Sequence, residues 1–144
     1  GPNKRISSKT YIKFMNLVSQ KHRCKFFLAT GKNIEEQKIL NELLTTNSKY
    51  ECYPLDNLNL NEILPIIKNC DVSICNDSSF SHLSSGLGID TIVLIADTPL
   101  LYGSYSSKMF PIMPDKVNDT QPNILAKDRI DPNKILEQFN RILN

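Results

Sequence analysis

The fold of this chain is decided by residues 71–95, which read DVSICNDSSFSHLSSGLGIDTIVLI. Residues 71–75 and 91–95 are short runs rich in apolar and β-branched side chains, which predicts two strands. Between them, turn and capping residue types precede a predicted helix over 80–87, and Gly88 is placed to end it. The stretch therefore predicts a strand–helix–strand unit. Two strands joined in this way are parallel, and their crossover is almost always right-handed.

The rest of the chain alternates helical and extended patterns in the same way. Apolar spacing predicts helices at 8–21, 34–44 and 131–143. A further helix is predicted to begin at a cap formed by Asn59 or Asn61 and to run to Asn69. A short apolar stretch predicts a buried strand at 25–30, and a weaker strand is predicted at 50–55. The region after Asp97 is rich in proline and polar residues, so we expect loops there until the last helix. Strands alternating with helices predict a doubly wound, Rossmann-like α/β domain, in which helices cover both faces of a mostly parallel sheet.

Length and composition limit the classes of protein that fit. The chain has 144 residues, with 40% hydrophobic and 22% charged residues, which is typical of one globular domain. Seventeen basic residues oppose fifteen acidic ones, so no broad basic surface for nucleic acid is expected. No apolar run approaches the ~20 residues of a membrane span, which predicts a cytoplasmic protein with no transmembrane segment. The four cysteines lack a C-x-x-C pair, and we expect reduced, mostly buried thiols and no metal site.

The first two residues indicate that the sequence is part of a longer natural chain. Gly1 and Pro2 look like the remnant of a cleaved purification tag, so we expect the natural chain to continue upstream of Asn3. On this interpretation, residues 3–144 form a single Rossmann-like domain.

The turn after the first strand of the 71–95 unit carries the clearest candidate binding residues. Asp77, Ser78 and Ser79 lead into the helix, and His82 follows Ser78 by about one helical turn, so the ring can face the same opening as the hydroxyls. Backbone N–H groups at a helix N-terminus, hydroxyls and an imidazolium suit a phosphate or diphosphate. The alternative is that Asp77 or Ser78 only caps the helix, while His82 packs against the neighbouring strand.

Further candidates are expected at the carboxyl ends of the other strands, where ligands bind in open α/β sheets. Thr98 follows the next strand and can donate to a phosphate oxygen. Glu35 and Glu36 can accept hydrogen bonds from ribose hydroxyls, although a favourable charge in a first helical turn explains both equally well. Lys4, with Arg5 beside it, precedes a helix and can reach a diphosphate; the alternative is a solvated basic end of the chain.

Several catalytic motifs are missing from the sequence. It has no G-x-S-x-G elbow, no G-x-G-x-x-G and no P-loop, so neither a nucleophile nor a cofactor is predicted. Tyr102, Tyr105 and Phe110 interleave with Lys108, a pattern also found in nucleic-acid-binding proteins. Without a basic surplus, we interpret them as a loop folded back on the domain.

Residues 68–99 resemble the signature of the heptosyltransferase family, glycosyltransferase family 9. That signature begins with an acidic residue, Thr or Ser, Gly, two further residues and His. A helix of small residues and a Leu-Gly pair follow. Asp77, Ser78 and His82 match the first part, and the pair at 87–88 matches the last. Three other segments occur in the same order as in the family. They are Lys4-Arg5 before a helix, residues 27–31 with Glu35 and Glu36 after them, and residues 60–64. The resemblance covers most of residues 4–99.

The resemblance implies one lobe of a B-type glycosyltransferase, the C-terminal lobe that binds a nucleotide-sugar donor. It implies that the donor diphosphate lies on Asp77, Ser78, Ser79 and His82 with help from Lys4, and that Glu35 or Glu36 meets the ribose. Transfer in the family is inverting and metal-independent, and the base lies on the N-terminal lobe. The whole protein is then expected to act on a glycan or lipid-linked acceptor in surface-polysaccharide or lipopolysaccharide assembly, at the inner membrane face. The chain alone is expected to bind donor without catalysing transfer.

The sequence departs from the family pattern at Ser79 and Ala96, where the family has glycine, and Asp97 adds a negative charge nearby. Two alternatives therefore stay open: a non-catalytic α/β module that binds a protein, or a lobe of a sugar-nucleotide epimerase. The family's first strand also precedes Lys4 and lies centrally in the sheet. Upstream residues supply that strand, or the sheet is rearranged, or a second chain completes it by exchange in a homodimer.

Overall fold

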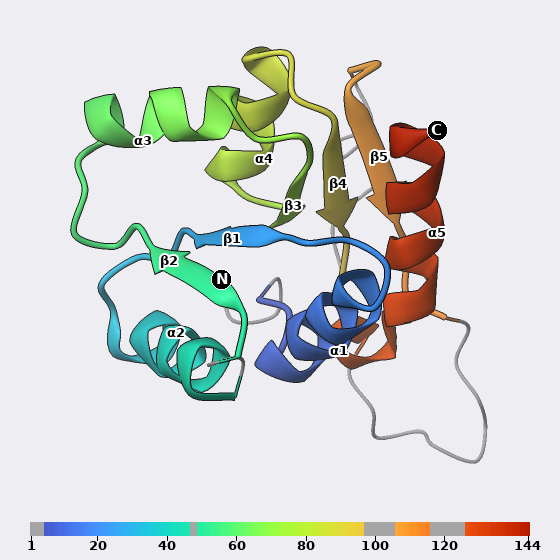
Figure 1. Ribbon diagram of the computed structural model, residues 1–144, viewed down its shortest axis with the longest axis horizontal. Coiled ribbons are helices and arrows are strands. Elements are labelled where there is room, and N and C mark those ends of the chain that lie inside the picture. The colour runs from blue at the N-terminus through green and yellow to red at the C-terminus, as the bar shows by residue number, and fades with distance from the viewer. Residues whose placement is uncertain (1–4, 47–48, 97–105, 116–125) are drawn as a thin grey trace.

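The computed structural model describes residues 5–46, 49–96, 106–115 and 126–144 of the chain (Figure 1). Helices and strands alternate along it, as predicted. The elements in chain order are α1 (Ser8–Ser19), β1 (Lys25–Leu28), α2 (Ile34–Thr46), β2 (Glu51–Pro54), α3 (Leu60–Lys68), β3 (Ser73–Asn76), α4 (Ser79–Gly86), β4 (Thr91–Leu94), β5 (Met109–Ile112), a 3-10 turn (Ala126–Arg129) and α5 (Pro132–Leu143).

The ends of the helices follow the capping signals in the sequence. Asn59 caps α3: its side chain accepts a hydrogen bond from the Glu62 N–H at 3.0 Å, and the Glu62 carboxylate accepts from the Asn59 N–H at 3.2 Å. Pro65 lies inside α3 without ending it. Asp131 caps α5 by accepting from the Asn133 N–H at 2.9 Å. Local capping chemistry therefore places these helices where the sequence predicts them.

All the strand pairs in the described part of the chain are parallel, which confirms the predicted α/β class. They form two groups: β1 pairs with β2, and β3, β4 and β5 pair in that order. The single sheet expected from the sequence is therefore divided between β1 and β3. In Figure 1, α3 and α4 lie on one side of the strands, and α1 and α2 lie on the other.

Strand β5 is absent from the predictions, and the loop expected there is wrong. The Thr91 N–H donates to the Lys108 carbonyl at 2.8 Å, and the Ile95 N–H donates to the Ile112 carbonyl at 3.0 Å. Pro111 made this segment look like a loop, but a strand at a sheet edge tolerates a residue without an N–H. Phe110 lies on β5 and packs against the core. Tyr102 and Tyr105 lie outside the described residues.

Burial is uneven among the strands. Every residue of β4 is buried, as expected for a strand covered on both faces. The prediction that β1 is buried is wrong, because Phe27 is 40% exposed and stacks on Tyr53 of β2 at the surface, with the ring centroids 5.3 Å apart. The four cysteines are free thiols, as predicted, and each is half-buried.

The end of α4 shows why Gly88 follows it. Gly88 has φ +84°, the left-handed region that favours glycine. The Gly88 N–H donates to the Ser85 carbonyl and the Ile89 N–H donates to the Ser84 carbonyl, each at 3.0 Å, so both bonds of a Schellman motif are present. Ile89 and Leu83 share one hydrophobic cluster, which adds the apolar contact of that motif.

Gly88→Ala is expected to lower the free energy of unfolding by about 1–2 kcal/mol, because a Cβ is strained at this φ. Gly86, at the end of the same helix, has no positive φ and nothing within 4 Å of an added Cβ. Gly86→Ala is therefore the matched control and should leave stability unchanged or raise it by up to about 1 kcal/mol. Urea denaturation of both variants measures the difference, and equal losses would contradict the assignment.

Candidate functional site

The N-terminus of α4 is the centre of the candidate site. Strand β3 ends at Asn76, Ser78 is the N-cap of α4, and Ser79 is its first residue. Ser81 is fully buried, and its hydroxyl donates to the Ser78 carbonyl at 2.6 Å. The Ser81 hydrogen bond therefore stabilises the turn on its buried side, while the outer surface of the turn is accessible to solvent.

Ser79 and His82 lie on that outer surface. Both side chains are exposed and, three residues apart on a helix, they share one face. The alternative in which His82 packs against the neighbouring strand is therefore wrong. Asp77 and Ser78 precede Ser79 and are half-buried. Ser78 is the N-cap of α4, which agrees with the alternative that Asp77 or Ser78 caps the helix. The N-terminus of α4 thus presents the Ser79 hydroxyl and the His82 imidazole on one exposed face, next to the N-cap Ser78.

A row of serines fixes α4 against β4. Ser81, Ser84 and Ser85 are the buried residues of the helix, and Ser84 Oγ lies 2.8 Å from Thr91 Oγ1 of β4. The Ser85 hydroxyl donates to the His82 carbonyl at 3.1 Å. Buried hydroxyls with satisfied hydrogen bonds hold the helix in one position.

The loop before α1 lies beside the first turn of α2. Arg5 donates to the Glu35 carboxylate, and the Glu35 side chain is 69% exposed. Glu36 accepts a hydrogen bond from the Asn33 side chain, and the Asn33 oxygen accepts from the Glu36 N–H at 2.8 Å. A Cβ on Gly31 would lie 2.3 Å from Glu36 Oε2, so the Glu36 side chain folds over that loop. Of the two acids predicted for ribose, Glu35 is the one that the structure places next to a basic residue.

A hydrogen bond between α1 and β3 links the segment that follows Arg5 to the strand that leads into α4. The Tyr11 hydroxyl of α1 donates to the Asn76 side-chain oxygen at the carboxyl end of β3. Burial raises the pKa of Tyr11 far above its ordinary value, and nearby Cys75 adds to the shift. The start of α1 therefore lies at the carboxyl ends of β1 and β3. Lys4 and Thr98, the other two predicted site residues, lie outside the described residues, as does Asp97.

Tyr11 and Cys75 predict a loss of stability in alkali. Burial also raises the pKa of the Cys75 thiol, whose ordinary value is 9.0. The unfolded chain therefore loses these protons at lower pH than the folded chain, so the stability they contribute is present below about pH 9 and is lost as the pH rises. We expect the urea midpoint to fall between pH 8 and 10, and to fall less in a variant with Tyr11→Phe and Cys75→Ala. The other three cysteines shift in the same direction and serve as a constant background in both proteins. An equal fall in both proteins would contradict the assignment.

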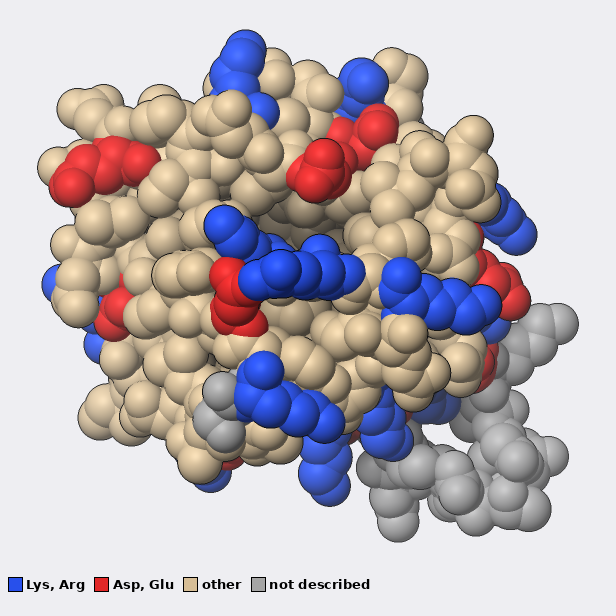
Figure 2. All heavy atoms as spheres, in the orientation of Figure 1, with Lys and Arg blue, Asp and Glu red and all other residues tan. Residues whose placement is uncertain are grey.

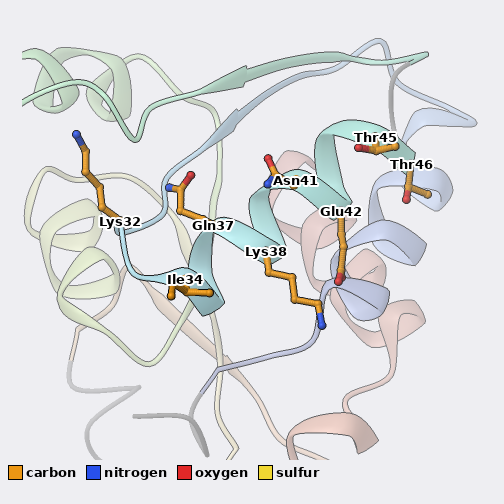
Figure 3. A pocket seen from close by; sticks show the side chains of 8 residues that line it. All are labelled: Lys32, Ile34, Gln37, Lys38, Asn41, Glu42, Thr45 and Thr46. Carbon is orange, nitrogen blue, oxygen red and sulfur yellow. The ribbon is translucent and has the colours of Figure 1, made fainter.

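A separate hollow of about 740 Å³ lies along α2 (Figure 3). Most of the residues that line it are of polar type, including Lys38, Asn41 and Glu42, although their apolar parts form much of the surface. Glu42 also accepts a hydrogen bond from the Ser8 hydroxyl of α1. Ile34, at its edge, is 88% exposed. None of the lining residues is among the site residues predicted from the sequence, and the hollow includes none of the residues at the N-terminus of α4.

Two further features are absent from the part of the chain that the structure describes. Within residues 5–46, 49–96, 106–115 and 126–144, no three His, Cys, Asp or Glu side chains gather as metal ligands. In the same described ranges, no helix has the length and apolar character needed to cross a membrane.

Comparison with known proteins identifies the family. No curated protein sequence matches the chain. Among solved structures, it is similar to the ADP-heptose lps heptosyltransferase II of E. coli, with a TM-score of 0.80 and 20% identity over 99% of this chain and 43% of that one. It is also similar to the E. coli heptosyltransferase WaaC with ADP, with a TM-score of 0.79 and 14% identity over 97% of this chain and 40% of that one. The chain thus spans about two-fifths of their length. The pattern of glycosyltransferase family 9 (heptosyltransferase) matches residues 1–121, so the chain belongs to that family.

Proposed function

We propose that this chain is the donor-binding lobe of a glycosyltransferase and that it binds a nucleotide-diphosphate sugar at the N-terminus of α4. The observation that carries the proposal is the accessible surface formed by Ser79 and His82 beside Asp77 and Ser78. A helix N-terminus attracts anions through its free N–H groups and the positive end of its dipole. The diphosphate is the part of the donor that such a surface suits.

The residues around Arg5 are proposed to hold the nucleoside. Glu35 is exposed in the first turn of α2 and can accept from ribose hydroxyls, and Glu36 can do so if its side chain leaves the Gly31 loop. Arg5 supplies positive charge beside Glu35, and Lys4, which precedes it in the sequence, is proposed to bind the diphosphate. Thr98 is proposed to donate to the phosphates from the loop after β4. Each of these roles is a prediction for mutagenesis.

The class of donor and acceptor is proposed from the relatives. One WaaC structure was solved with ADP and another, at a TM-score of 0.76 and 13% identity, with ADP-2-deoxy-2-fluoro heptose. An ADP-sugar is therefore the first donor to test, and lipopolysaccharide assembly is the proposed setting for the whole protein. Transfer is proposed to be inverting and metal-independent, with the base on a second lobe.

Calorimetric titration of the full-length protein with ADP-, GDP- and UDP-sugars tests the proposal. Saturable binding of at least one donor is the expected result, and titration of the 144-residue chain then shows whether this lobe binds it alone. Failure of the full-length protein to bind any of them would exclude donor binding and favour the protein-interaction module. Conversion of a free sugar nucleotide into its epimer would instead favour the epimerase lobe.

His82→Ala is expected to weaken the affinity for the nucleotide diphosphate by about 10- to 100-fold. Hydrogen bonds to charged groups contribute about 1.5–3 kcal/mol, and alanine removes this one. His22→Ala is the matched control, because His22 lies just beyond α1 and its ring contacts Phe139 at a centroid distance of 5.6 Å. Equal affinities for the two variants would exclude His82 from the site.

A further inference from the structure

Asn76 is a polar residue beside the candidate site to which no function has been assigned above. It is the last residue of β3, and Asp77 and Ser78 follow it directly. Side chains along a strand alternate between the two faces of a sheet, and Ile74, two residues earlier, packs against the core cluster that includes Phe14 of α1. The half-buried Asn76 side chain therefore lies on the α1 face of the sheet, at its carboxyl end.

The Tyr11 hydroxyl determines which way the Asn76 amide group is turned. Tyr11 donates to the Asn76 side-chain oxygen. Burial raises the pKa of Tyr11 far above its ordinary value, so the phenol keeps its proton and needs an acceptor for it. A buried hydroxyl without an acceptor is costly, and the Asn76 oxygen is the acceptor that the structure provides. The amide oxygen is therefore held towards Tyr11.

The amide nitrogen of Asn76 then points away from Tyr11 and carries two N–H groups. Among the residues that the structure describes, none accepts a hydrogen bond from this nitrogen. In the same part of the chain, the buried side-chain polar atoms that lack a partner belong to Ser19 and Thr30. The Asn76 nitrogen is not one of them, so it is accessible, and its two N–H groups are available to a ligand.

The end of β3 connects the two groups of residues that the proposed function assigns to the nucleotide sugar. Along the chain, Asn76 leads into the turn before Ser79 and α4. Through its hydrogen bond it contacts α1, and Arg5, just before α1, is bound to Glu35 of α2. Figure 1 shows α1 and α4 on opposite sides of the strands, and the surface drawn in Figure 2 is hollowed near its centre, where β1 and β3 lie in Figure 1. A ligand that contacts both groups therefore crosses the end of β3.

We propose that Asn76 is a further residue that binds the nucleotide sugar, with its amide N–H groups donating to the diphosphate, and that Tyr11 is the positioning residue that turns this amide towards the ligand. The inference rests on the proposed function and adds a binding residue to it.

The charge of the neighbouring residue gives this amide its importance. Asp77 follows Asn76, and an ionised carboxylate only accepts hydrogen bonds and repels an anion. The two N–H groups of Asn76 offset that repulsion at the same turn. An amide that rotated by half a turn would present its oxygen instead, and an oxygen cannot pair with a phosphate oxygen. The Tyr11 hydroxyl prevents this rotation by occupying the amide oxygen.

Asn76→Asp tests the binding role. A carboxylate has nearly the shape of the amide and still accepts from Tyr11, but it replaces the two N–H groups with a second acceptor and a negative charge. The full-length protein and its variants are titrated calorimetrically with ADP-, GDP- and UDP-glucose. For each ligand that the parent binds, the expected loss of affinity is at least about 30-fold. Asn61→Asp is the matched control, because it adds the same charge at an exposed position on α3, and it should bind as the parent does.

The pH dependence of the Asn76→Asp variant separates a lost contact from a general structural change. At lower pH the new carboxyl group takes up a proton, loses its charge and gains an O–H that can donate to the phosphate. The ratio of the variant's affinity to the parent's is therefore expected to rise by about fivefold or more between pH 7.5 and pH 5. Taking the ratio removes the titration of His82, which both proteins share, and the ratio for Asn61→Asp should stay constant.

Tyr11→Phe tests the positioning role. It removes the hydroxyl and keeps the ring, and the expected loss of affinity is about three- to tenfold. Because Tyr11 is proposed to act through Asn76, the same substitution should cause no further loss in a protein that already carries Asn76→Ala. A residue that only stabilises the fold would weaken binding equally with and without Asn76, so this double-mutant cycle distinguishes the two roles.

Two outcomes would overturn the inference while the proposed function stands. One is equal affinity of Asn76→Asp and Asn61→Asp, which would exclude the amide from the site. The other is an equal loss from Tyr11→Phe with and without Asn76, which would make Tyr11 a structural residue. If the parent binds none of the three nucleotide sugars, the proposed function fails and the inference fails with it. If Asn76→Asp does not fold, Asn76→Ala takes its place without adding a charge, and its expected loss is about tenfold or more; unchanged affinity would overturn the inference.

Discussion

Ser79→Asp is expected to weaken nucleotide diphosphate binding by at least 100-fold while leaving the protein as stable as before, or slightly more stable. Ser79 is exposed and is the first residue of α4. A carboxylate there interacts favourably with the positive end of the helix dipole, by about 0.3–1 kcal/mol. The same negative charge would lie where the diphosphate is proposed to bind, so it repels the ligand and competes for the same N–H groups.

The opposite signs of the two effects make this variant informative. A loss of affinity caused by misfolding would be accompanied by a lower melting temperature, whereas the proposed site predicts lost affinity with an equal or higher one. Asn59→Asp is the matched control, because it adds one negative charge to the exposed N-cap of α3. Calorimetry and thermal denaturation of both variants provide the comparison. If Ser79→Asp binds donor as well as the parent does, the diphosphate does not lie at the N-terminus of α4.

Ile92→Ala is expected to lower the free energy of unfolding by about 3–4 kcal/mol, a large part of the stability of a small domain. Ile92 is fully buried in β4, where every residue is buried, and it belongs to the largest core cluster. The substitution removes three carbon atoms and leaves a cavity between α1, α5 and the strand, because the surrounding side chains relax only partly.

Ile34→Ala is the matched control for this loss. The chemical change is the same, but Ile34 is 88% exposed at the start of α2, so its cost is expected to stay below about 0.5 kcal/mol. Urea denaturation of the two variants under the same conditions measures the difference. Similar costs would mean that β4 is not the buried centre of the described sheet.

The order of helices and strands could be predicted from the sequence because its signals are local. Asn59, Gly88 and Asp131 act within one turn of the chain, and each helix end lies near where these residues place it. Strand β5 could not be predicted in this way, because Pro111 argues against a strand unless the strand is known to lie at an edge. The exposure of Phe27 depends on which strands pair, which no local pattern specifies.

The candidate site was only partly predictable for the same reason. Ser79 and His82 share a helix, so their spacing alone places them on one face. The ion pair between Arg5 and Glu35 joins residues thirty positions apart, and Tyr11 reaches Asn76 across sixty-five positions. Contacts of this kind depend on the packing of α1 against the strands and have no signature in the sequence.

The buried serines of α4 have a consequence for the thermodynamics of binding. The Ser81 hydroxyl is hydrogen-bonded to the Ser78 carbonyl in the turn, and the Ser84 hydroxyl is hydrogen-bonded to Thr91 of β4. The N–H groups offered to an anion are therefore already oriented before any ligand arrives, and little conformational entropy remains to be lost on association. A preorganised binding site of this kind favours fast association of the ligand, because no slow ordering step precedes binding.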